Sequence, residues 1–108
     1  MQEVIVKAID KIGFFVDVKA EVPNNLAKII NGLNKMCDDG IFKYKPHIDA
    51  EAYKKGIYKI SIKTENVDND IIEQVKNIAT NEGCDVKIDT CYQWLVIKDK
   101  KQTINHYF

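Results

Sequence analysis

The sequence predicts one α+β domain in which two amphipathic helices cover one face of an antiparallel sheet. Alternating apolar and polar residues, typical of strands, recur over residues 14–20, 42–48, 57–64 and 86–97. Apolar residues at helical spacing recur over residues 26–37 and 71–82. The resulting order of strand, helix, strand, strand, helix, strand is that of a ferredoxin-like βαββαβ sandwich.

The composition bounds the class of protein. A chain of 108 residues fits a single domain over residues 1–108, and its formal net charge of zero argues against a protein that coats nucleic acid. All 16 basic residues are lysines, so the arginine that usually clamps phosphates is absent. With no apolar run long enough to span a bilayer and no basic leader, we expect a cytoplasmic protein without a membrane partner.

The first half of the chain has clear element boundaries. In the first core strand Val16, Val18 and Ala20 share the inward face, and residues 4–9 are expected to pair with it as an extra edge strand. Pro23 suits the first turn of the helix that follows. Gly40 suits the left-handed position that ends this helix.

The second half repeats the pattern. Over residues 42–48 and 57–64 the predicted inward residues are Phe42, Tyr44, Ile48, Tyr58, Ile60 and Ile62. Residues 50–56 are expected to form a hairpin loop between these strands. Asp68 or Asp70 can cap the second helix, and Gly83 can end it.

The last predicted strand, residues 86–97, is apolar at both parities near its end. Such a strand is covered on both faces, and the N-terminal strand, the C-terminal tail or a second subunit could cover it. We expect a homodimer or higher oligomer. The predicted oligomer interface consists of Trp94, Leu95 and Ile97. Residues 102–108 are expected to return as a further edge strand.

One short segment resembles a known family. Glu21, Pro23, Leu26 and Ala27 stand where ACT domains place an acidic residue, a proline, a leucine and a small residue between the first strand and helix. The family's glycine after proline is Asn24 here. The resemblance implies a regulatory module that pairs side by side and binds a small effector such as an amino acid. It places the effector at Glu21, Asn24 and Asn25, although these asparagines could instead only cap the helix.

A second hypothesis uses the sheet face opposite the helices. The alternation places several lysines there, and we expect Lys43, Lys45, Lys59 and Lys63 to bind an acidic protein partner. The alternative is a solvated sheet face whose lysines prevent aggregation. A small, arginine-free chain of this kind would suit a phage or mobile element and a host protein as its target.

Other chemistries of this fold lack their residues. Acylphosphatases require an arginine, and copper chaperones a C-x-x-C loop. RNA-recognition domains need aromatic residues where Ile57 and Lys59 stand, so nucleic acid is not the expected partner. Neither a nucleophile paired with a base nor a metal-ligand spacing is evident, so we expect no enzyme, no metal and no cofactor.

Overall fold

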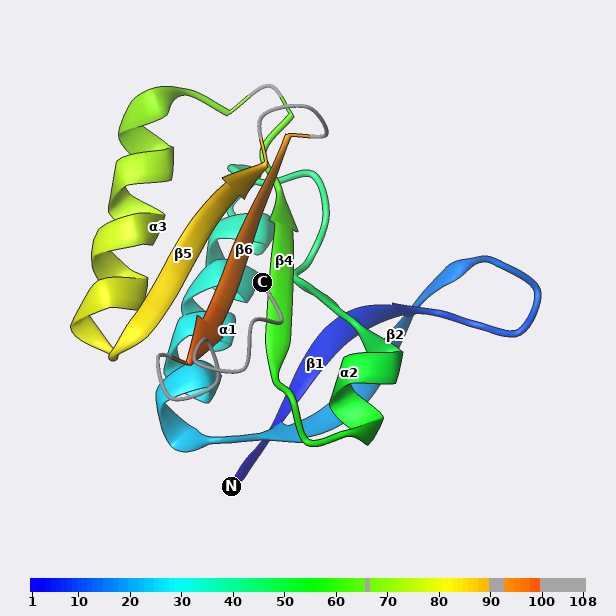
Figure 1. Cartoon of the computed structure of the whole chain (residues 1–108). Helices are drawn as coiled ribbons and strands as arrows, with labels where there is room; N and C mark the ends of the chain where they lie inside the picture. Colours follow the sequence, from blue (N-terminus) through cyan, green and yellow to red (C-terminus); the bar gives the residue numbers. More distant parts are fainter. Residues whose placement is uncertain (66, 90–92, 100–108) are drawn as a thin grey trace.

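The computed structural model describes residues 1–65, 67–89 and 93–99 (Figure 1). In chain order its elements are β1 (Gln2–Ile9), β2 (Phe15–Val22), α1 (Asn24–Asp38), β3 (His47–Ile48), α2 (Ala50–Lys54), β4 (Lys59–Lys63), α3 (Asn69–Asn81), β5 (Cys84–Asp89) and β6 (Trp94–Asp99). The predicted α+β class is confirmed. Among the described residues, none of the helices combines the length and the apolar character that crossing a membrane requires.

The described strands form one mixed sheet of six strands in the order β2-β1-β3-β4-β6-β5. β1 and β3 run parallel, and the other neighbouring strands run antiparallel. The ferredoxin-like topology is not confirmed, because the strand order differs. A ferredoxin-like sheet places the strand before the first helix in its interior. Here that strand is β2, and it lies at the edge.

α1 and α3 pack on the same face of the sheet and contact each other. Every side chain that α1 turns toward the sheet is fully or nearly fully buried: Leu26, Ala27, Ile29, Ile30 and Leu33. Val6, Ile60, Ile62, Leu95 and Ile97 meet them from three strands. Burial of apolar surface at this layer is the main stabilising term of the fold. It also leaves the opposite sheet face free of α1 and α3.

The helix boundaries follow their predicted signals. Asp68 caps α3, and its carboxylate accepts the backbone N–H of Ile71 at 3.0 Å. Gly40 and Gly83 follow α1 and α3 with φ of +83° and +74°, which glycine adopts at little cost. α1 differs, because Pro23 is its N-cap and no side chain caps it.

The predicted strand 86–97 is corrected to a hairpin of β5 and β6. Val86 lies opposite Ile97, and Ile88 lies opposite Leu95, so each pair joins an even-numbered residue to an odd-numbered one. A connection between two strands resets which parity faces the core. The apolar residues at both parities therefore serve one face. The expected strand over residues 102–108 lies outside the described residues.

The predicted strand 42–48 is also corrected. Only His47 and Ile48 pair in the sheet, and Tyr44, expected to face inward, is exposed. Phe42 is buried as expected, although it lies in the loop before β3. The expected loop over residues 50–56 contains α2, because Asp49 accepts the backbone N–H groups of Glu51 and Ala52 and so starts a helical turn.

The expected strand over residues 4–9 is confirmed as part of β1, which pairs along its whole length with β2. Its expected place at the edge of the sheet is wrong, because β1 lies between β2 and β3. Their connecting turn projects away from the rest of the molecule (Figure 1). Asp10 Oδ1 accepts the N–H groups of Ile12 and Phe14, and Gly13 has φ of +87°. The projecting end carries exposed apolar side chains: Ile9, Ile12, Phe14 and Phe15.

Candidate binding site on the open sheet face

We call the face of the sheet opposite α1 and α3 the open face. The strand registers place one row of residues across all six strands of this face. In the order of the strands, the row reads Asp17, Lys7, His47, Ser61, Val96 and Lys87. Because residues opposite each other in neighbouring strands share a face, these side chains lie on one surface.

A hollow of about 290 Å³ lies on the open face. It is lined by Lys7, Phe15, Tyr44, Lys45, His47, Lys63, Glu65 and Trp94. Three rings form a row in it, since the ring centroids of Phe15 and His47 are 5.2 Å apart and those of His47 and Trp94 are 6.0 Å apart. Lys63 Nζ lies 5.0 Å from the centroid of the Trp94 ring, a cation–π distance.

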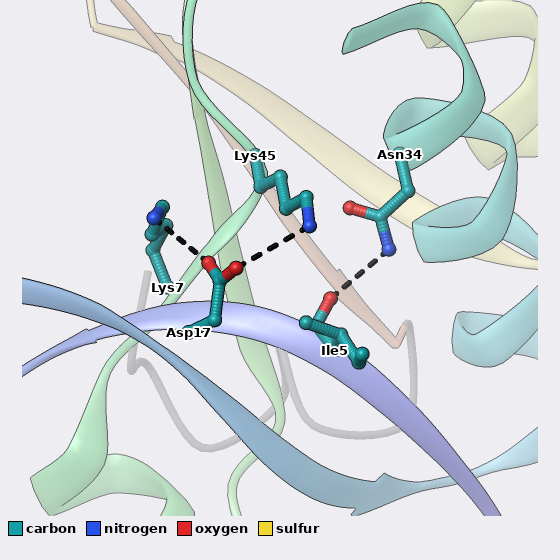
Figure 2. Close-up of polar contacts among 5 residues, drawn as sticks. All are labelled: Ile5, Lys7, Asp17, Asn34 and Lys45. Atoms are coloured by element: carbon teal, nitrogen blue, oxygen red, sulfur yellow. Dashed lines mark hydrogen bonds and ion pairs between the residues drawn. The ribbon is translucent and has the colours of Figure 1, made fainter. Parts of the chain in front are cut away.

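One carboxylate holds two of the lysines beside the hollow. Asp17 Oδ1 lies 2.8 Å from Lys7 Nζ, and Asp17 Oδ2 lies 3.4 Å from Lys45 Nζ (Figure 2). The hydrogen bond from Lys7 is the main cause that holds the pKa of Asp17 below its usual value of 3.8. Figure 2 also shows that Asn34 of α1 donates to the Ile5 carbonyl of β1, which ties the helix to the same strand.

His47 lies at the centre of this surface. Two further hollows, toward α2 and toward β5, also have His47 in their lining. Burial lowers the pKa of the imidazole below 6.5, against the opposing effect of the Asp49 carboxylate. Among the described residues no group forms a hydrogen bond with His47 Nε2. This nitrogen has almost no exposed surface, so it is not open to a bound partner.

The structure brings two of the four predicted partner-binding lysines into the hollow, Lys45 and Lys63. Lys59 lines the two neighbouring hollows. Lys43 is exposed in the loop before β3, with its Nζ 5.4 Å from the Tyr44 ring centroid. Three of the four lysines thus border one continuous surface.

The three predicted effector residues lie at the connection between β2 and α1. Asn24 and Glu21 are exposed. Asn25 is half-buried, and its side-chain amide donates to Asp99 Oδ2 at 2.9 Å and to the Glu82 carbonyl at 3.2 Å. Asn25 therefore joins α1 to the end of α3 and to β6. Neither asparagine caps α1.

The three predicted interface residues are divided between the two faces. Leu95 and Ile97 have no exposed surface and lie opposite Ile62 and Ile60 of β4 in the core. The prediction that these two residues form a subunit interface is wrong, because the same chain covers them. Trp94 lies on the open face, half-buried in the hollow.

Sequence reasoning missed the aromatic cluster, although a signal for it exists. Phe15 shares its strand parity with Asp17 and Lys19, so it had to face away from the helices. Its meeting with His47 and Trp94 depends on the strand order, which no local pattern encodes.

The described cysteines lie apart from this surface. Burial is the main cause that raises the pKa of the Cys84 thiol to about 12, and it also raises the pKa of Cys37. Both thiols are therefore protonated and poorly nucleophilic at neutral pH. Among the described residues, no three His, Cys, Asp or Glu side chains are grouped as metal ligands would be.

Comparisons with family models, curated proteins and solved structures find no match for this chain.

Proposed function

We propose that this protein is a non-catalytic binding module that receives an acidic segment of a partner protein on the open face. The observation that carries the proposal is the hollow in which Phe15, His47 and Trp94 lie between lysine side chains. Aromatic side chains that are half-exposed on a sheet supply contact area at low entropic cost, and lysines around them favour an anionic partner.

The charges around the hollow support an acidic partner. Lys7, Lys45 and Lys63 line it, whereas Glu65 is the only carboxylate among the lining residues. Asp17 engages Lys7 and Lys45 from the side of β2 and so holds their ammonium groups near the rings. Toward α2, Lys59 is accompanied by the carboxylates of Asp49 and Glu51, so the positive border ends there. A carboxylate-bearing segment laid along this row would meet these ammonium groups in turn.

Apolar neighbours favour a protein over a nucleic acid. Ile5 and Ile9 of β1 are exposed and share the strand parity of Lys7, so aliphatic side chains extend the same face. Nucleic-acid surfaces combine stacking aromatics with a strongly basic groove, and this chain has no arginine and no net charge. A mixed aliphatic and aromatic patch with a charged border is typical of protein interfaces.

A small anionic effector is the second candidate, and the volume of the hollow favours it. At about 290 Å³ the hollow is close to the lower size of small-molecule sites, about 300 Å³. Such an effector would lie at the hollow rather than at Glu21, Asn24 and Asn25. The regulatory, ACT-like role with an amino acid at those three residues stays a prediction.

Trp94 allows a direct test, because it is the one tryptophan of the sequence and it lines the hollow. Its fluorescence is followed during titration with a glutamate-rich peptide that carries leucine and phenylalanine. We expect a saturable change that weakens with added salt. The same peptide with lysine in place of glutamate is the control ligand.

Two variants assign the binding to the hollow. Lys45→Glu combined with Lys63→Glu should abolish the response, because both side chains line the hollow. Lys28→Glu reverses the charge of an exposed lysine on α1 and should leave the fluorescence response intact. A stronger response to an oligonucleotide, or an equal response of the double variant, would contradict the proposal. A response only to free amino acids would favour the effector instead.

A further inference from the structure

We propose that two copies of this chain form a homodimer by pairing their β2 strands antiparallel, with the twofold axis at Val18. β2 is an edge of the sheet and is eight residues long. Long edge strands expose unpaired backbone groups that readily accept another strand. The dimer does not depend on the proposed binding of an acidic segment.

The hydrogen bonds around β1 show which groups of β2 face outward. The N–H of Asp10 donates to the Phe14 carbonyl, and residues whose numbers sum to 24 lie opposite each other in β1 and β2. In an antiparallel pair, hydrogen-bonded and non-hydrogen-bonded positions alternate. Even-numbered residues of β2 therefore bond to β1. The backbone groups of Phe15, Asp17 and Lys19 point to the free edge.

The same alternation is visible on the other side of β1. The N–H of Lys7 donates to the Pro46 carbonyl, and the Ile5 carbonyl accepts from Asn34. Both are odd-numbered, and both groups point away from β2. At the end of β2, the outward N–H of Glu21 is already bonded to the Tyr53 hydroxyl at 2.9 Å. A second strand can therefore pair with β2 only before Glu21.

These limits leave one favourable register. Asp17 opposite Asp17, or Lys19 opposite Lys19, would place like charges together. Lys19 opposite Glu21 would need the N–H that Tyr53 occupies. Asp17 opposite Phe15 brings no attraction. Asp17 opposite Lys19 of the second copy gives two opposite-charge pairs by symmetry, because the relation is reciprocal. Phe15 then lies opposite Glu21 at each end, where the Tyr53 hydroxyl occupies the Glu21 N–H, so the hydrogen-bonded pairing is limited to Asp17 and Lys19.

The other side of the strand suits the same register. Val18 would then lie opposite Val18 of the second copy, and Val16 opposite Ala20. Val16 and Val18 are only partly buried within one chain, although they have the parity of the core face. Dimerisation would cover apolar side chains on one face and pair charges on the other. A second copy fits this edge because the edge is complementary to itself.

Charge reversal tests the dimer by sedimentation equilibrium. We expect the wild type to have the mass of two chains. Asp17→Lys and Lys19→Asp each place like charges opposite each other twice, so the dissociation constant should rise roughly tenfold or more. An equimolar mixture of the two variants should restore a dimer with one chain of each, because opposite charges meet again.

The mixture separates loss of pairing from loss of folding. Asp17→Lys also removes the contacts with Lys7 and Lys45, whereas Lys19→Asp removes a looser one, in which Lys19 Nζ lies 3.9 Å from the exposed Glu3 carboxylate. Lys87→Asp makes a matched change on β5, the opposite edge of the sheet, and should remain dimeric. A monomeric wild type, or a mixture that stays monomeric while both variants are folded by circular dichroism, would overturn the proposal.

Discussion

The two faces of the sheet use the same strands for different purposes. On the helix-covered face, strand residues such as Val6, Ile60 and Ile62 have no exposed surface. On the open face, Phe15 is 54% exposed and Ile9 is 55% exposed. Successive side chains of a strand point to opposite faces, so one strand supplies both environments. Stability is therefore concentrated on one face, which leaves the other free to vary for recognition.

The largest expected effect tests this division directly. Ile62→Ala removes a fully buried side chain between α1, α3 and the sheet, so the free energy of unfolding should fall by about 2–5 kcal/mol. Ile9→Ala makes the same chemical change on the exposed hairpin and should cost less than about 1 kcal/mol. Urea denaturation followed by circular dichroism measures both. Equal losses would show that the open face also carries the stability of the fold.

The parts of the fold that the sequence predicted well are the locally encoded ones. The apolar stripe of α1, the Asp68 cap and the glycines that follow α1 and α3 each depend on neighbours within a few residues. The inward parity of Ile60 and Ile62 was likewise readable from alternation. Both faces of β4 could therefore be assigned before any strand order was known.

The parts that could not be predicted are those that depend on distant pairing. An alternating pattern does not reveal which strand lies beside which, so the edge position of β2 was not foreseen. Between Val86 and Leu95 the apolar residues change from even to odd numbers. This change fits either a strand covered on both faces or a hairpin, and the structure has the hairpin. The hollow combines Phe15, His47 and Trp94 from three strands, so it could not be predicted before the strand order was known.

The two asparagines at the start of α1 also differ in whether they stabilise the fold. Asn25→Ala should lower the free energy of unfolding by about 1–3 kcal/mol, because its amide joins α1 to Asp99 and Glu82. Asn24→Ala should be nearly neutral, since Asn24 is exposed and caps nothing. Thermal denaturation distinguishes them. A larger loss for Asn24 would contradict the structural role assigned to Asn25.

On the open face, His47 should make stability depend on pH. Because its folded pKa lies below the usual 6.5, the unfolded chain binds the proton more readily. The stability that neutral His47 contributes is therefore fully present above pH 6.5 and is lost as the pH falls below 6.5. His47→Gln should remove this part of the pH dependence. Trp94 fluorescence, recorded against pH, should show a transition with its midpoint below 6.5 in the wild type only, since the two rings are 6.0 Å apart.

The smallest expected effect concerns Asp17, whose side chain is 46% exposed. Asp17→Asn should lower the free energy of unfolding by less than about 1 kcal/mol at neutral pH, because exposed ion pairs contribute little and salt screens them. The folded pKa is depressed, so the charge of Asp17 stabilises the fold above pH 3.8, and this contribution is lost as the pH falls through the folded pKa. The difference between wild type and variant in urea denaturation should therefore shrink on acidification. A difference that persists unchanged well below pH 3.8 would mean that the Asp17 side chain acts by packing. The open face would then also stabilise the fold at Asp17, and the contrast between the two faces would be weaker there.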